Sequence, residues 1–190
     1  MGQNLNWDIL IIGGASGSGK TSISRPLSQL YGVDLVRVDD FQCLLEAIIS
    51  PEMIPTLHHW KIEPNWSNES VEWVVERLKG VSQAWMLGLR AVIKDRLEES
   101  LPMILEGDFI LPKLSVSFDN PRIKTIFVHE PSREQILQNY FSREGTHQAH
   151  RADISHAFGN WLKDNCKKHS IPVVESRPWD NLMERVISKI

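Results

Sequence analysis

Cysteine is scarce in this sequence: two residues, Cys43 and Cys166, occur among 190. Two cysteines are too few for a disulfide framework, and these two lie too far apart in the chain for a zinc motif. We therefore interpret both as small buried hydrophobic residues of a protein that resides in the reducing cytoplasm.

Long hydrophobic runs and an excess of one charge are missing as well. No segment approaches the roughly 20 apolar residues that cross a membrane, and no positively charged segment precedes the first apolar run, which excludes a signal peptide. The 21 basic and 24 acidic residues give a formal net charge of −3, which excludes a strongly basic nucleic-acid-binding protein and an acidic disordered tail. We expect a cytoplasmic protein with one domain, residues 1–190, and with no membrane or nucleic-acid partner.

What the sequence does contain is an alternation of short apolar runs with longer segments of helical periodicity, which is typical of a parallel α/β sheet. The first run, residues 9–12, ends in glycine and is apolar throughout, as expected for a central strand that is buried on both faces. The predicted strands are residues 9–12, 33–38, 103–106, 125–128 and 171–174. The predicted helices are residues 20–31, 41–49, 132–141, 153–169 and 180–190.

One stretch breaks this alternation. More than sixty residues separate the second and third predicted strands, whereas a simple crossover needs far fewer. Its first part is rich in Pro, His and Trp, and residues 69–99 have the three-to-four spacing of a helix, with Gly80 and Gly88 as sites where it would kink or split. We interpret residues 51–100 as a helical insertion, and a plain crossover helix with a long loop is the alternative.

The segment with the clearest chemistry directly follows the first predicted strand. It matches the pattern G-x-x-x-x-G-K-[ST] in full, with Gly14, Ala15, Ser16, Gly17, Ser18, Gly19, Lys20 and Thr21. Glycines let the backbone curl into a ring of N–H donors for phosphate oxygens, and the helix that follows adds a positive partial charge. We expect bound ATP, with Lys20 on the β- and γ-phosphates and the Thr21 hydroxyl on Mg²⁺.

Carboxylates follow the second and third predicted strands. Asp39 would accept a proton from a substrate hydroxyl as that hydroxyl attacks the γ-phosphorus, while Asp40 would cap the next helix. The reverse division, or a purely structural role for the pair, is the alternative. Glu106 or Asp108 is a candidate ligand of Mg²⁺, directly or through water, and a solvated loop carboxylate is the competing interpretation.

Together these motifs resemble the small-molecule P-loop kinases, in particular chloramphenicol phosphotransferase, the zeta-toxin kinases and the 2-phosphoglycerate-kinase-like proteins. Residues 104–112 are similar to the edge of the third strand in the last of these groups, and uridine-kinase-like enzymes share the Asp-Asp-Phe of residues 39–41. The resemblance implies a three-layer P-loop NTPase fold, whose five-stranded parallel sheet has the order 2-3-1-4-5 and helices on both sides. It also assigns the base to Asp39. It assigns no acceptor, because the 51–100 insertion matches nothing in these families; our own expectation is that the acceptor hydroxyl is held under this insertion.

The resemblance further implies a lid whose arginines close over the transferring phosphate. Residues 139–155 fit this lid, with Arg143 and Arg151 as its arginines and Gly145 as a hinge. Arg133 is a further choice.

The loop after the last strand lies near the adenine in such kinases. Arg177 or Trp179 would stack on the base there, and the alternative is a Pro-Trp helix start that packs on the core. Among the residues of the insertion, four tryptophans would either form an aromatic pocket for the acceptor or pack the insertion onto the sheet. These are Trp60, Trp66, Trp73 and Trp85.

The sequence therefore predicts an ATP- and Mg²⁺-dependent kinase that transfers the γ-phosphoryl group to a hydroxyl of a small molecule, such as a metabolite, an antibiotic or a nucleoside. A nucleotide-binding switch or ATPase module that acts on a protein partner is the alternative. The absence of an Asn-Lys-x-Asp motif argues against a GTPase. An exposed tryptophan patch would be compatible with a homodimer.

Overall fold

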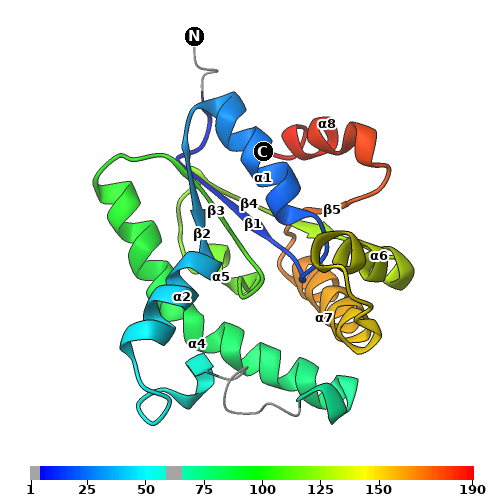
Figure 1. Cartoon of the computed structure of the whole chain (residues 1–190). Helices are drawn as coiled ribbons and strands as arrows, with labels where there is room; N and C mark the ends of the chain where they lie inside the picture. Colours follow the sequence, from blue (N-terminus) through cyan, green and yellow to red (C-terminus); the bar gives the residue numbers. More distant parts are fainter. Residues whose placement is uncertain (1–4, 59–65) are drawn as a thin grey trace.

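A computed structural model describes residues 5–58 and 66–190, and it contains one five-stranded sheet (Figure 1). The strand order is β2-β3-β1-β4-β5, and every neighbouring pair is parallel. This confirms the predicted α/β fold class and strand order. The strands are β1 (Ile9–Gly13), β2 (Asp34–Arg37), β3 (Met103–Gly107), β4 (Ile123–His129) and β5 (Val173–Glu175).

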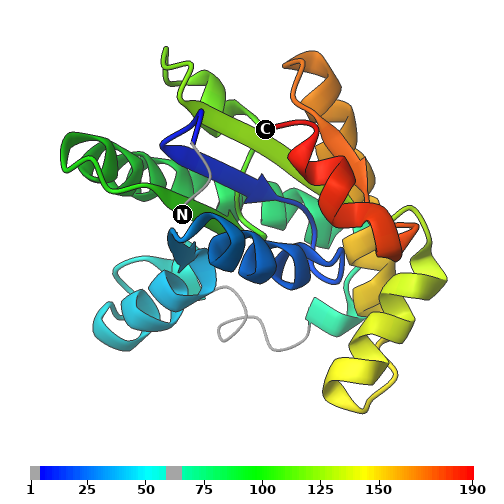
Figure 2. The same ribbon diagram turned by 90° about the horizontal axis from the view of Figure 1, so that it is seen from above.

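Helices cover both faces of the sheet, which gives the three layers that the resemblance implied (Figures 1 and 2). They are α1 (Lys20–Tyr31), α2 (Val38–Ile48), α4 (Val71–Glu98), α5 (Lys113–Val116), α6 (Arg133–Glu144), α7 (Ala149–Lys168) and α8 (Leu182–Ile187). Three short 3₁₀ helices are η1 (Pro55–His58), η2 (Trp66–Asn68) and η3 (Trp179–Asn181). The predicted helix 20–31 has the bounds of α1, whereas α7 begins four residues before the predicted position.

The central strand β1 explains the layering, because its side chains alternate between the two faces. Ile9 and Ile11 pack in one cluster with residues of α4 and α7, whereas Leu10 and Ile12 pack in a second cluster with residues of α1 and α8. All five residues of β1 are buried. A strand covered on both faces must be apolar throughout, which is the pattern read from the sequence.

The helix after β2 begins earlier than predicted. α2 starts at Val38, so Asp39 and Asp40 lie in its first turn, and its N-cap residue is Arg37, which makes no side-chain cap. The prediction that Asp40 caps this helix is therefore wrong. The physical reason is that Asp40 is already the third residue of the helix, where its backbone is helical and cannot be the cap. The Arg37 guanidinium pairs with both carboxylates, at 3.1 Å from Asp39 Oδ2 and 3.5 Å from Asp40 Oδ1.

The 51–100 stretch contains η1, η2 and the long helix α4. α4 runs unbroken through Gly80 and Gly88, where added side chains would meet open space. It packs against α7 and against the face of the sheet that carries Ile9 and Ile11. Trp60 lies outside the described residues.

Two further expectations can be checked against this fold. Cys166 is buried as predicted, but Cys43 is exposed on α2, so its interpretation as a buried hydrophobic residue is wrong. Within the part of the chain that the structure describes, no helix has the length and apolarity that a membrane span requires.

Two leucines of α4 test how this helix packs. Leu89 is 1% exposed and Leu87 is 81% exposed, so the same substitution probes the buried and the open side of one helix. We expect Leu89→Ala to lower the free energy of unfolding by about 2–5 kcal/mol and Leu87→Ala to change it by less than about 0.5 kcal/mol. Urea denaturation followed by circular dichroism measures both, and equal effects would contradict the packing of α4.

Candidate functional site

The carboxyl ends of the parallel strands meet at one edge of the sheet, which is where α/β proteins bind ligands. A cleft of about 1190 Å³ opens there. Most of the site residues predicted from the sequence line this one cleft; they are Ser16, Gly17, Ser18, Gly19, Lys20, Thr21, Asp39, Glu106, Asp108, Arg143, Arg151 and Arg177. Gly14 and Ala15 of the loop do not line it.

The loop between β1 and α1 has the backbone shape that its glycines predict. Gly14, Gly17 and Gly19 have φ values of 146°, 77° and 94°, all in the range that favours glycine. At Gly14 a Cβ atom would also lie 2.3 Å from the carbonyl oxygen of Val128. The Ser18 hydroxyl is buried and has no hydrogen-bond partner among the described residues. The loop is therefore a tight turn with polar groups still to be satisfied, as a phosphate-binding loop would be.

Lys20 stands at the end of this loop with its side chain almost fully buried. Its ammonium group donates to the carbonyl oxygen of Ala15 at 2.9 Å and forms an ion pair with Asp108. A buried cation needs an anionic partner, and here a carboxylate supplies it. Phosphate oxygens of a nucleotide would offer Lys20 the same kind of partner.

Glu106, the fourth residue of β3, is 2% exposed. The Thr21 hydroxyl donates to its Oε1 at 3.0 Å, and Arg37 Nε donates to the same oxygen at 3.3 Å. Burial raises the pKa of Glu106, and the nearby Lys20 charge and the Thr21 hydrogen bond oppose that rise.

This arrangement fits Mg²⁺. A hydroxyl and a carboxylate lie side by side, and Mg²⁺ is bound through hard oxygen donors, commonly one or two carboxylates together with substrate phosphates. Among residues 5–58 and 66–190, no group of three or more His, Cys, Asp or Glu residues is arranged to hold a metal ion. Thr21 and Glu106 would hold Mg²⁺ together with the nucleotide, and Asp108, which pairs with Lys20 in this structure, stays a candidate ligand once phosphate oxygens take its place on Lys20.

Asp39 lines the cleft, whereas its neighbour Asp40 does not. Burial and the negative charge of Asp108 raise the pKa of Asp39 above its ordinary value, and the charges of Lys20 and Arg37 oppose that rise. A carboxylate with a raised pKa is a better proton acceptor, which suits a general base. Of the two adjacent aspartates, Asp39 thus has both the position and the basicity for this role.

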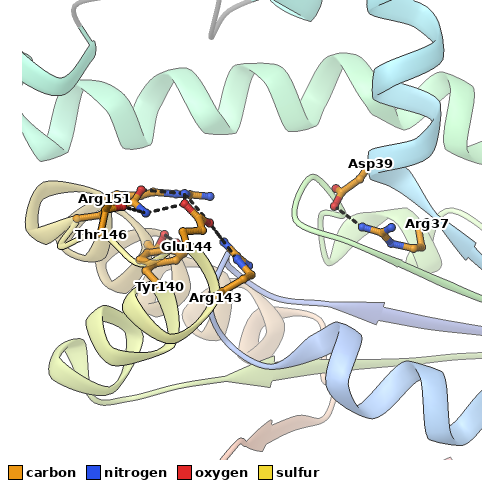
Figure 3. Close-up of polar contacts among 9 residues, drawn as sticks. Arg37, Asp39, Tyr140, Arg143, Glu144, Thr146 and Arg151 are labelled. Atoms are coloured by element: carbon orange, nitrogen blue, oxygen red, sulfur yellow. Dashed lines mark hydrogen bonds and ion pairs between the residues drawn. The ribbon is translucent and has the colours of Figure 1, made fainter.

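Arg37 was not singled out in the sequence, yet its guanidinium contacts Glu106 and Asp39 at once and lines the cleft. Figure 3 shows its contact with Asp39. Its position as the last residue of β2, two residues before Asp39, is the one sequence signal for it. The contact with Glu106 depends on the pairing of β2 with β3, which sets Arg37 beside Glu106.

The predicted lid, residues 139–155, is a helix–turn–helix formed by the end of α6 and the start of α7. Arg143 and Arg151 both contact the carboxylate of Glu144 (Figure 3). Gly145 ends α6 in the left-handed conformation, with φ of 71°. Arg133, the further choice for a lid arginine, instead pairs with Asp153 at 2.7 Å, and it does not line the cleft.

The loop after β5 also lines the cleft. Trp179 starts the short helix η3, is 39% exposed and lines the cleft, so it is not a buried core residue. Its ring lies close to Gly19 of the phosphate-binding loop: a Cβ atom added to Gly19 would be 2.8 Å from the indole ring. The Arg177 guanidinium lies 5.7 Å from the ring centroid, and its Nε is 3.4 Å from Glu130 Oε2. The two side chains thus lie together beside the loop, and the Arg177 charge is paired with the buried Glu130.

Apolar side chains from three elements complete the cleft. Leu78 of α4, Phe109 after β3, and Ile154 and Phe158 of α7 line it. Trp66 lines it as well, whereas Trp85 is buried behind Phe109, with ring centroids 6.1 Å apart and an angle of 3° between the ring planes. One described tryptophan of the 51–100 stretch thus belongs to the cleft and another supports its wall.

Comparisons with known proteins agree with this geometry. No family model matches the chain. A curated 2-phosphoglycerate kinase of Pyrococcus horikoshii is 25% identical over 96% of this chain and 64% of its own length, and one of Methanocaldococcus jannaschii is 24% identical over 88% and 58%. The chain thus spans somewhat less than two thirds of the curated relatives it matches.

Solved structures with the same arrangement include two small-molecule kinases. A gluconokinase of Sinorhizobium meliloti has a TM-score of 0.60 at 16% identity, over 98% of this chain and 93% of its own. A shikimate kinase of Acinetobacter baumannii has a TM-score of 0.52 at 14% identity, over 96% and 92%. The fold is that of the P-loop small-molecule kinases. The relatives and the structural neighbours named here are all called kinases.

Lys20 gives the simplest test of nucleotide binding by a P-loop of this kind. A hydrogen bond to a charged group contributes roughly 1.5–3 kcal/mol, so we expect Lys20→Ala to weaken ATP binding roughly tenfold or more. Isothermal titration calorimetry measures this affinity. Lys167→Ala is the matched control, because Lys167 is exposed, pairs with Asp164 at 2.9 Å and lies outside the cleft. Equal ATP affinity in the two variants would rule out the loop as the phosphate site.

Proposed function

We propose that this chain is an ATP- and Mg²⁺-dependent phosphotransferase that moves the γ-phosphoryl group of ATP to a hydroxyl of a small molecule. The observation that carries the proposal is that the phosphate-binding loop and the Asp39 carboxylate of α2 line the same cleft. The curated relatives named 2-phosphoglycerate kinase and the kinases among the structural neighbours support it.

In this reaction each residue has a defined task. The backbone N–H groups of the loop bind the phosphates, and Lys20 exchanges the carboxylate of Asp108 for phosphate oxygens. Asp39 accepts the proton of the acceptor hydroxyl as the hydroxyl oxygen forms a bond to the γ-phosphorus. The bond from that phosphorus to the β–γ bridging oxygen breaks at the same time, and ADP leaves. Bound at Thr21 and Glu106, Mg²⁺ would neutralise charge on the phosphate oxygens.

Arg143 and Arg151 add positive charge to the side of the cleft formed by α6 and α7. We assign them to the transferring phosphoryl group, whose oxygens carry the negative charge of the transition state. Arg177 and Trp179 are assigned to the base of the nucleotide, because a planar guanidinium and an indole ring both stack on aromatic rings.

Room for two ligands supports a transferase over a nucleotide-binding switch. The cleft, at about 1190 Å³, is larger than the roughly 300–1,000 Å³ of a pocket for one drug-sized ligand. Its apolar wall of Leu78, Phe109 and Phe158 lies at the part of the cleft that α4 and α7 form, and suits the carbon skeleton of a small acceptor. A switch that signals to a protein partner needs neither this space nor Asp39 in the cleft.

The acceptor is identified by turnover. ADP release is measured with a panel of hydroxyl compounds, beginning with 2-phosphoglycerate because it names the relatives, and continuing with sugars, sugar acids, nucleosides and hydroxylated antibiotics. Stimulation of ADP release by one compound, with a phosphorylated product seen by mass spectrometry, supports the transferase. ATP hydrolysis that no compound stimulates favours the ATPase alternative.

Asp39→Asn tests the base. General base catalysis contributes typically about 10²–10⁴-fold, so we expect this variant to lower kcat of the acceptor reaction by about that factor and to leave the KM for ATP nearly unchanged. Asp40→Asn is the control, because Asp40 has the same neighbour, Arg37, but lies outside the cleft lining. A similar loss in both variants would assign the effect to the structure of α2 and not to proton transfer.

Because the pKa of Asp39 is raised in the folded protein, the acid limb of the kcat/KM profile should lie above pH 3.8, the ordinary pKa of an aspartate. The activity is present where Asp39 is ionised and falls as the pH drops through its pKa. A profile of initial rates between pH 4 and pH 8 measures this. An acid limb at or below the ordinary value would contradict Asp39 as the base.

A further inference from the structure

A single carboxylate joins the two arginines of the lid. Glu144, the last residue of α6, accepts from Arg143 Nε at 2.9 Å, and its two oxygens lie 3.1 and 3.0 Å from Arg151 Nη1. Arg143 comes from α6 and Arg151 from α7, so Glu144 is the point at which the two helices bring their arginines together (Figure 3). Both arginines line the cleft, whereas Glu144 does not.

A buried aromatic ring lies beneath this group. The guanidinium carbon of Arg151 is 4.4 Å from the ring centroid of Tyr140, and that of Arg143 is 5.3 Å from it. Tyr140 is fully buried, and its hydroxyl is 2.7 Å from the Ser155 hydroxyl on α7. The ring is therefore fixed from below, and the two arginines share one rigid support as well as one carboxylate.

Charge explains why the carboxylate matters. Two guanidinium groups held over one ring repel each other, and a negative charge between them offsets that repulsion. Burial acts to raise the pKa of Glu144, but hydrogen bonds from Gln148 and Arg143 and the charge of Arg151 outweigh it and lower the pKa to about 2. Glu144 is thus ionised at neutral pH, and the group keeps one net positive charge beside the cleft.

We infer that Glu144 is a positioning residue, which holds Arg143 and Arg151 as one anion-binding pair directed at the cleft. The inference rests on the proposed function, since it assigns to this pair the transferring phosphoryl group. Glu144 itself touches no reacting atom. It acts only through the two arginines, and this distinguishes it from a residue that merely stabilises α6.

Glu144→Gln keeps the size of the side chain and removes its charge. We expect it to lower kcat of the acceptor reaction at least about tenfold, because the arginines lose the geometry that favours the transition state, and to change the melting temperature by no more than its control does. Glu134→Gln is that control. Glu134 lies on the same helix and pairs with Arg133 at 2.8 Å, but this pair lies outside the cleft.

A double-mutant cycle separates positioning from a structural role. With Arg151→Met already present, Glu144→Gln should lower kcat by less than about threefold, because one of the two arginines that it positions is gone. A loss as large as in the wild-type background, or full activity of Arg151→Met alone, would overturn the inference. So would Glu144→Gln activity equal to that of Glu134→Gln.

Calorimetric measurement of ATP binding by the wild-type chain, together with its acceptor activity, distinguishes failure of the proposed function from failure of the role inferred for Glu144. Wild-type protein that binds ATP but phosphorylates no acceptor overturns the proposed function, and this inference falls with it. Wild-type protein that phosphorylates an acceptor, with Glu144→Gln as active as the control, overturns this inference alone.

Discussion

The buried carboxylate of Glu106 is the constraint on which the site depends. A charge that is removed from water must be compensated within the protein, and three residues of α1 and β2 contribute to doing so. Thr21 from the start of α1 and Arg37 from the end of β2 both donate to its Oε1, and Lys20 adds a positive charge nearby. These contacts fix three parts of the site relative to one another. They are the Thr21 hydroxyl, the end of β2, and the paired strands β1 and β3.

Strand register makes this compensation available. In the parallel sheet, Glu106 of β3 lies between Ile12 of β1 and Arg37 of β2. The chain leaves β1 one residue later for the phosphate-binding loop, and it leaves β2 at Arg37 for α2. A shift of β2 by one residue would turn its side chains to the opposite faces of the sheet, and it would take Arg37 from Glu106. The site therefore depends on the same apolar pattern that folds the sheet.

Local and long-range features differ in how far the sequence predicts them. Three features are local patterns that the sequence indicated. They are the phosphate-binding loop, the bounds of α1, and the acids near the carboxyl ends of β2 and β3. The strand order came from the resemblance to known kinases. The contacts of Arg37 with Glu106 and of Glu144 with Arg151 join residues from different elements, and no spacing in the sequence predicts them. The assignment of Asp40 as a cap failed at a helix boundary instead, because α2 begins at Val38 and its N-cap residue is Arg37.

The helix α6 sets a fixed distance within this cleft. Asn139 on its second turn donates to the carbonyl oxygen of Gly17 at 2.8 Å, so the helix is attached to the phosphate-binding loop. Arg143 follows four residues later, which is about 6 Å along a helix that rises about 1.5 Å per residue. The helix thus separates the phosphate-binding loop from the arginine pair. The distance between them is determined by the helix and not by the ligand.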